Sequence, residues 1–499
     1  MRRAAVASAG AAFATLAGAA PATAHAIAER YDLPVPLGYF VAGSAAVVAV
    51  TFAIAALFVF AAPRKREERR VHPPESLCPL AHSVRGYGVA VFLLVIAAGL
   101  FGHEHPVRNI APTMVWVGWW VGFGFLCAFV TDLWPLLNPW RTLFFLSERA
   151  RRRRHADRPI RPYPARLAEW PAVLFLFVFV WIEIASPFAS RPFALALCIL
   201  GYSAVTFAGM AVYGREGWLN RAEAFTLVFS ILGRFAPLRI APAERKGGFV
   251  ALRPWGAGLL AGDPPSAAVV AFVLLLLSAV LFDGLLGTAF WRWLEPRLPG
   301  DRAGTIAATL GLAATWLAFL GAYLATCAVM SRAAGGDGTI ASARAYVLTL
   351  VPIAVGYNLA HNFSYLLIQG QEIIRLASDP FGLEWNLFGS AGRTPNLDVV
   401  DARSTWYVAI GAIVAGHVIA VWLAHVVALR RAASRSLAIR ALVPLTVLMV
   451  IYTGLSLSIL AEPLVRFRTP DPGYTQHRPP AAPVLISQSA GRSGYRLGA

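Results

Sequence analysis

Charged residues are scarce in this chain of 499 residues. Only 14% of the residues are Asp, Glu, Lys or Arg, whereas 58% are hydrophobic, and the mean hydropathy is +0.60. A soluble globular domain carries about 25% charged residues, so the composition excludes that class and indicates a multi-pass membrane protein. The fold class is therefore predicted to be all-α, a polytopic bundle of spanning helices of about 20 apolar residues each.

Cysteine is also scarce, since Cys78, Cys127, Cys198 and Cys327 are the only four in the chain. No CxxC pair occurs, which argues against a disulfide framework and against a thiolate zinc site. Acidic residues are fewer than basic ones, and the formal net charge is +18. The arginines lie between hydrophobic segments and no aromatic–basic recognition motif accompanies them, so no nucleic-acid partner is expected.

The two ends of the chain do not read as part of a helix bundle. Residues 1–24 have the three parts of a secretory signal peptide, namely Arg2 and Arg3, an Ala-rich apolar run and a small-residue cleavage site. Cleavage after Ala24 would leave His25 as the mature N-terminus; cleavage two residues later and an uncleaved first helix are the alternatives. Residues 463–499 are Pro-rich and polar, and they are expected to be disordered.

Ten apolar segments within residues 25–462 are long enough to be spanning helices. Lys and Arg concentrate in every second connection, most strongly in residues 149–161. By the positive-inside rule these connections face the cytoplasm of a bacterial inner membrane, which places the mature N-terminus and the C-terminal tail in the periplasm. The ten segments are approximately 38–61, 86–102, 112–133, 170–187, 193–213, 265–289, 304–330, 345–368, 406–429 and 441–461.

Two cytoplasmic segments are predicted to be interfacial helices on the inner leaflet, near residues 138–150 and 220–235. In the first, Asn138 is a suitable cap and Pro139 follows in the first turn. In the second, Asn220 with Glu223 three residues later resembles a capping box. Asp132, at the inner end of the third segment, is expected to cap a helix or pair with an arginine.

Ionisable residues inside spanning segments are costly and mark functional sites. His361 and His417 lie in the eighth and ninth segments, about 12 Å and about 16 Å below their outer ends at 1.5 Å per residue. Asp283 and Glu183 lie near the outer ends of two further segments. The outer half of the bundle is therefore predicted to hold a site in which His361, His417 and Asp283 ligate a metal, with Glu183 and Asp283 as candidate catalytic carboxylates.

A second group of candidate ligands lies at the outer surface, namely His25, His103 and His105. Imidazole and carboxylate together suit a divalent ion such as Zn, Mn, Fe or Cu. The alternative for each histidine is a hydrogen-bonded packing role, and the two carboxylates have arginines as alternative partners. His425, about 12 Å deeper than His417, is expected to be structural.

Several motifs together resemble a family of bacterial integral membrane proteins labelled fenitrothion hydrolase. They are "TDLWPLLNPWR", "WIEIASP", "EGWLNRAEAF", "SDPFGLEWNLFG" and "TWYVAIGAIVAGHVIAVWLAH", and the resemblance extends over nearly the whole chain. It implies hydrolysis of an organophosphorus triester, but it brings no established catalytic residues.

Three functions agree with these observations. The first is a metal-assisted hydrolase of apolar phosphotriesters, in which the ion activates hydroxide and stabilises the phosphoryl oxygen. The second is a transporter, a channel or a copper-handling protein, and the third is a haem-binding redox protein with His361 and His417 as axial ligands. The expected partners are the lipid bilayer and either a small apolar substrate or a metal ion.

Overall fold

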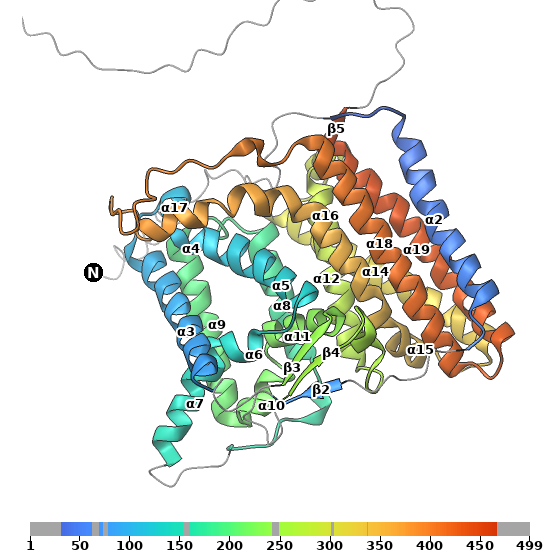
Figure 1. The fold of residues 1–499 in the computed structure, drawn as a ribbon, viewed down its shortest axis with the longest axis horizontal. Helices are drawn as coiled ribbons and strands as arrows, with labels where there is room; N and C mark the ends of the chain where they lie inside the picture. Colours follow the sequence, from blue (N-terminus) through green and yellow to red (C-terminus); the bar gives the residue numbers. More distant parts are fainter. Residues whose placement is uncertain are drawn as a thin grey trace, which may run out of the picture.

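The computed structural model of the protein is a helical bundle (Figure 1), and it describes residues 31–61, 69–72, 78–152, 159–241, 249–300, 304–336 and 338–466. The predicted signal peptide, His25 and most of the predicted tail lie outside the described residues. Within them, nine helices are long and apolar enough to cross a membrane. The all-α class and the multi-pass membrane architecture predicted from composition are therefore confirmed.

All ten segments expected to span are helical. The long helices are α2 (Leu37–Phe58), α3 (Cys78–Phe101), the continuous run of α4 (Ile110–Thr113), η3 (Met114–Phe123) and α5 (Gly124–Phe129), then α9 (Pro192–Tyr213), α12 (Ala267–Leu286), α14 (Thr305–Ala334), the run of α15 (Thr339–Tyr346), η7 (Val347–Leu350), α16 (Val351–Gln369) and α17 (Glu372–Ser378), α18 (Ala402–Arg431) and α19 (Arg435–Leu464). The tenth is α8 (Trp170–Ile184), which has only 15 residues.

The two ends of the described chain lie side by side, which bears on the number of crossings. Strand β1 (Tyr31–Asp32) pairs in parallel with β5 (Val465–Arg466), and Figure 1 shows both at the upper end of the bundle. Nine crossings would separate these ends across the bilayer, whereas ten return the chain to its starting side. The pairing therefore favours α8 as a tenth, short crossing, about 22 Å long at 1.5 Å per residue.

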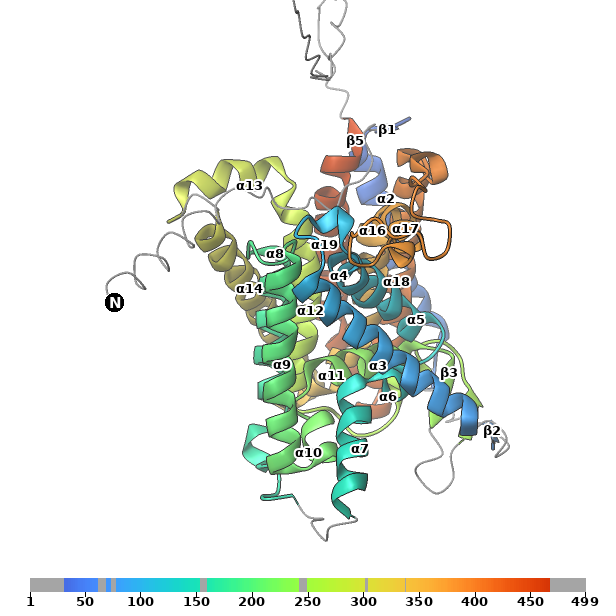
Figure 2. The same cartoon turned by 90° about the vertical axis from the view of Figure 1, so that its left-hand side faces the viewer.

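Helix α12 is the centre of the bundle. It is apolar on every face and is buried over most of its length, as expected for a helix surrounded by other helices. It packs against α8 on one side and against α14 and α16 on the other. Figure 1 shows α2, α18 and α19 packed together on one side, and Figure 2 shows α9 with the short helix α10 (Arg215–Leu219) at its lower end.

Helices α16 and α18 make the most extensive contact between two helices of the bundle, and glycine makes it possible. A Cβ atom on Gly416 would lie 2.5 Å from the Pro352 carbonyl oxygen, and one on Gly356 would overlap the Ala412 carbonyl oxygen. Small residues facing each other allow helix backbones to approach closely in membranes. This contact holds the helix of His361 against the helix of His417.

Short elements lie at both ends of the bundle (Figure 2). Strands β2 (Arg69–Val71), β4 (Phe249–Leu252) and β3 (Leu238–Ala241) form an antiparallel sheet in that order. The remaining elements are α6 (Trp134–Leu137), α7 (Pro139–Arg152), α11 (Ala224–Phe235), α13 (Ala289–Leu294) and the 3-10 turns η2 (Pro106–Arg108), η4 (Ala165–Leu167), η5 (Ala257–Leu260), η6 (Glu295–Arg297) and η8 (Leu397–Val399).

The structure confirms the predicted cap of one of the two helices expected on the inner leaflet and contradicts that of the other. Asn138 caps α7 as predicted, because its Oδ1 accepts from the Arg141 amide at 2.9 Å. The capping role of Asn220 is wrong: α11 begins at Ala224, and Glu223 is its cap. Nor does α11 lie flat on the surface, since most of its residues are buried against α5, α6, α8 and α16. Its packing against these four helices places it inside the bundle.

Asp132 has the structural role expected of it. Its Oδ1 accepts from the Trp134 amide at 3.0 Å, just before α6. Burial raises the pKa of this carboxyl to about 6, although the Trp134 bond and the charge of Arg141 oppose the shift. The folded state therefore favours the protonated carboxyl. The stability of the folded state falls as the pH rises from 3.8, the pKa of this group in the unfolded chain, through about 6, its pKa in the folded protein.

We expect Asp132→Asn to stabilise the protein at pH 8 and to have little effect at pH 4. Asparagine keeps an acceptor for the Trp134 amide and carries no charge to bury. Two pKa units at about 1.4 kcal/mol each give an upper bound of about 3 kcal/mol. Thermal unfolding of both proteins between pH 4 and 8 measures the difference, and a gain that does not grow with pH would contradict the assignment.

Candidate functional site

Asp283 and His361 form a direct pair between two spanning helices. The Asp283 Oδ2 atom, on the last turn of α12, lies 2.7 Å from the His361 Nε2 atom on α16. The His361 side chain is only 2% exposed, whereas that of Asp283 is 36% exposed. Gly284 allows this approach, because a Cβ there would lie 2.9 Å from the Tyr357 hydroxyl and 3.0 Å from Ile459. The pair thus joins an accessible carboxylate to a buried imidazole.

A string of aromatic polar side chains continues from His361 into the bundle. Tyr357 lies one turn away on α16, with its ring parallel to His361 at a centroid distance of 6.3 Å. Tyr452 on α19 follows at 6.4 Å, and His417 on α18 lies 5.8 Å beyond Tyr452. We call these five side chains, from Asp283 to His417, the polar string. It connects four spanning helices.

Polar atoms on Tyr357, Tyr452 and His417 lack hydrogen-bond partners among the residues that the structure describes. They are the hydroxyls of Tyr357 and Tyr452 and the Nε2 atom of His417, and all three are buried. The other ring nitrogen of His417, Nδ1, lies 2.8 Å from the Ile413 carbonyl oxygen in its own helix. Each buried unsatisfied group costs about 1–3 kcal/mol, so an arrangement with three of them calls for a functional explanation.

Glu183 lies near this string but belongs to another helix. It is partly buried on the last turn of α8, where the Trp120 indole approaches its carboxyl and Asp283 is close enough to interact electrostatically. Tyr365, one turn beyond His361 on α16, interacts with both carboxylates. The structure thus brings Asp283 and His361 into direct contact, and it places Glu183 within electrostatic range of Asp283.

The expected metal ligands are not brought together as a set. No group of three His, Cys, Asp or Glu side chains that could hold a metal ion occurs within the described ranges. His361 faces Asp283, whereas His417 faces Tyr452, so the two histidines do not share a site although their helices are neighbours. The described residues therefore do not fit a three-ligand metal centre.

The surface histidines form a pair without a third ligand in the described part of the chain. The rings of His103 and His105 lie 6.5 Å apart, and His103 Nδ1 accepts from the His105 amide. The Arg108 guanidinium lies 3.3 Å from His103 Nε2, a position that opposes a cation. The third expected ligand, His25, lies outside the described residues.

His425 is separate from the polar string. Its side chain is buried near the lower end of α18, and its Nε2 atom lies 3.4 Å from the Val59 carbonyl oxygen just after α2. The contact joins α18 to the end of α2, which is the packing role predicted for this residue.

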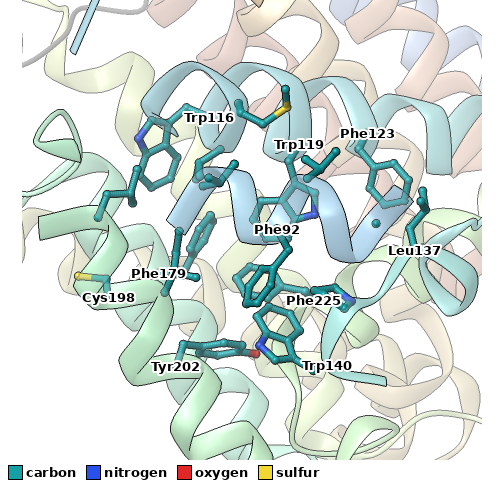
Figure 3. A pocket seen from close by; sticks show the side chains of 18 of the residues that line it. Phe92, Trp116, Trp119, Phe123, Leu137, Trp140, Phe179, Cys198, Tyr202 and Phe225 are labelled. Atoms are coloured by element: carbon teal, nitrogen blue, oxygen red, sulfur yellow. The ribbon is translucent and has the colours of Figure 1, made fainter. Parts of the chain in front are cut away.

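A cavity of about 620 Å³ opens between α3, η3, α8 and α9. We call it the aromatic cavity, because Figure 3 shows rings pointing into it from several elements. Its lining includes Phe92, Trp116, Trp119, Phe179, Tyr202 and Phe225. At one end the Tyr202 hydroxyl donates to Glu223 at 2.5 Å and accepts from the Ala224 amide. No charged side chain lines the cavity in the described residues.

One wall of the aromatic cavity is a π-helix. Segment η3 has ten residues in this conformation, and Trp116, Trp119 and Phe123 point from it into the cavity (Figure 3). The π-helix is rare and occurs frequently at functional sites. Trp120, which follows Trp119 in this segment, approaches the carboxyl of Glu183. The segment therefore lies between the aromatic cavity and the carboxylates.

Sequence reasoning missed the two tyrosines of the polar string and the aromatic cavity. The run "MVWVGWWVGF" contains an unusual density of tryptophan, which was the available signal for the cavity. Tyr357 lies one turn before His361, so helical spacing alone could have linked them. Tyr452 had no such signal, because its contact depends on how α19 packs.

Comparisons of the chain with protein-family models, with curated proteins and with solved structures find no match. The resemblance to the family labelled fenitrothion hydrolase therefore stays a prediction from sequence motifs.

Proposed function

We propose that this protein is a transporter of the bacterial inner membrane whose cycle is coupled to protons. The observation that carries the proposal is the Asp283–His361 pair, an accessible carboxylate bonded at 2.7 Å to a buried histidine. Ionisable residues within spanning helices are expensive, and chains of Asp, Glu and His occur in the proton relays of pumps and transporters.

The polar string supports a proton path from the outer end toward the middle of the bundle. Asp283 exchanges protons with water near the end of α12, and His361 receives them on Nε2. The hydroxyls of Tyr357 and Tyr452 and the Nε2 atom of His417 follow, and each of these groups can both donate and accept a proton. Their lack of partners among the described residues agrees with groups that wait for a mobile proton or water.

The direction of the path follows from the charge distribution. The basic connections lie at the lower end of Figure 1, where α7 and α10 are found, and the positive-inside rule places that end in the cytoplasm. Asp283 then lies on the periplasmic side. Both ends of the described part of the chain, β1 and β5, lie on that side too.

Proton flux into liposomes tests the proposal without a known substrate. Purified protein is reconstituted with an internal pH dye, and a potassium diffusion potential set with valinomycin drives the flux. We expect Asp283→Asn and His361→Gln to reduce the flux by about tenfold or more, equivalent to about 1.4 kcal/mol in the barrier. The asparagine and glutamine side chains of these variants cannot exchange a proton near neutral pH.

The matched controls are Asp398→Asn and His425→Gln. Asp398 is exposed in the loop before α18, and His425 lies off the polar string. Both controls should retain the wild-type flux. The absence of a potential-driven flux in the wild type, or equal flux in the Asp283 and His361 variants, would contradict the proposal.

A phosphotriester hydrolase is the second candidate, and the same pair favours it. A histidine bonded to a carboxylate is an arrangement that hydrolases use for a general base, and the resemblance of the sequence motifs implies this activity. Release of 4-nitrophenol from diethyl 4-nitrophenyl phosphate by the reconstituted protein, lost in His361→Gln, would favour the hydrolase over the transporter. Retention of metal by the purified protein would add support for the metal-assisted version.

A further inference from the structure

We infer that the aromatic cavity binds a neutral, lipid-soluble aromatic molecule that carries a hydrogen-bond acceptor. The cavity shares no lining residue with the polar string, so this inference does not rest on the proposed function. Five observations support it, namely the route of entry, the lining, the volume, an unsatisfied donor and a π-helix in the cavity wall.

The mouth of the aromatic cavity faces the lipid. Tyr87 on α3, Leu174 on α8 and Val205 on α9 line the cavity, and each is exposed on the surface of a membrane-spanning helix. An occupant therefore enters sideways from the bilayer. Such an entry excludes strongly charged ligands, which do not dissolve in the hydrocarbon region.

The lining selects flat rings over other apolar shapes. Trp119, for example, packs edge-on against Phe225 and Phe179, with centroid distances of 4.6 Å and 6.1 Å. Rings held in this way present both faces and edges, and aromatic guests pair with them at centroid distances of about 4.5–7 Å. The volume of about 620 Å³ falls within the range of about 300–1,000 Å³ that is usual for small-molecule sites.

The unsatisfied donor is Trp134, which lines the aromatic cavity. Its side chain is 4% exposed, and its Nε1–H has no acceptor among the residues that the structure describes. An indole can donate but cannot accept. A carbonyl or ether oxygen on the occupant would satisfy it, which is why the ligand is assigned an acceptor as well as a ring.

The π-helix adds an independent reason to expect a ligand. Segment η3 holds Trp116, Trp119 and Phe123 on the cavity wall over ten residues of an uncommon conformation. An α-helix of the same sequence would rotate these side chains out of register. The fold therefore retains a rare backbone form at the place where it shapes the cavity.

Photolabelling with benzophenone tests the inference in phosphatidylcholine nanodiscs. Benzophenone has two rings and a carbonyl acceptor, and irradiation attaches it to neighbouring C–H groups. We expect saturable labelling of peptides from residues 114–123, 174–182 and 195–205. Diphenylmethane, which lacks the carbonyl, should compete with about fivefold to tenfold lower affinity, the effect of one hydrogen bond.

Two variants separate the cavity from general lipid exposure. Val205→Trp fills the mouth and should abolish saturable labelling, whereas Leu197→Trp, on the same helix but outside the lining, should leave it unchanged. Trp134→Phe keeps an aromatic ring at this position and removes the Nε1–H donor. Benzophenone should then bind to this variant no better than diphenylmethane.

Each other result overturns a defined part of the inference. Labelling that is equal in the Val205 and Leu197 variants would remove the cavity as a site. Stronger competition by oleate than by diphenylmethane would show that the occupant is a lipid acyl chain. Preference for benzophenone that persists in Trp134→Phe would remove the role of the indole. None of these outcomes depends on proton flux.

Discussion

Replacement of Gly416 by alanine should separate helices α16 and α18. The added Cβ would lie 2.5 Å from the Pro352 carbonyl oxygen and 3.3 Å from the Ile353 Cα atom. Both are backbone atoms of a helix, so no side chain can rotate away and one helix must move. Overpacking of a closely packed core costs about 1–3 kcal/mol, and we expect a value near the upper end, measured as thermal unfolding in detergent.

Gly411→Ala is the matched control, because it adds the same methyl group to the same helix. A Cβ at Gly411 meets nothing within 4 Å, and the residue is exposed. Alanine is also the better helix former by about 1 kcal/mol, so Gly411→Ala should be neutral or stabilising. Equal melting temperatures for the two variants would mean that α16 and α18 are not in the contact described.

Replacement of Glu223 by alanine should produce the second large loss of stability. Glu223 is fully buried, and its carboxylate caps α11 by accepting from the amides of Phe225 and Thr226 at 2.9 Å and 2.8 Å. It also accepts from the hydroxyls of Tyr202 and Thr226. Alanine would leave four donors without this acceptor. A buried donor left unsatisfied costs about 1–3 kcal/mol, so we expect a total loss of about 3 kcal/mol.

Two further variants make this measurement specific. Tyr202→Phe removes a single donor from the network and should cost about 1 kcal/mol. Glu104→Ala removes an exposed glutamate at the upper end of the bundle and should change stability by less than about 0.5 kcal/mol. A melting temperature for Glu223→Ala within the range of these two variants would contradict the capping role.

The sequence determined the fold class and the positions of the long apolar helices because both depend on local chemistry. A run of about 20 apolar residues forms a helix in a bilayer whatever its neighbours, since its backbone polar groups have no other partners. The same reasoning places the ionisable residues by depth, because the rise per residue is fixed. For this reason Asp283 and His361 were correctly expected to lie near one another, and Asn138 was correctly read as a cap.

Rotation and packing of the helices were not available from the sequence. The sequence predicted that His417 and His361 lie at similar depths in the membrane. Only the tertiary structure shows that His417 faces Tyr452 whereas His361 faces Asp283. The position of α11 is a second example. Its length and apolar content suit both a surface helix and a buried one, and the choice depends on the space left between α5, α8 and α16.

The π-helix of η3 and the aromatic cavity depend entirely on the tertiary structure. The π-helical and α-helical hydrogen-bond registers of a segment differ by one residue and differ little in free energy. Contacts of η3 with α3, α8 and α11 therefore decide which register is kept. That choice sets which tryptophans face the aromatic cavity and which approach Glu183. Hydrophobicity thus decided that this segment enters the membrane, whereas packing decided what its side chains contact.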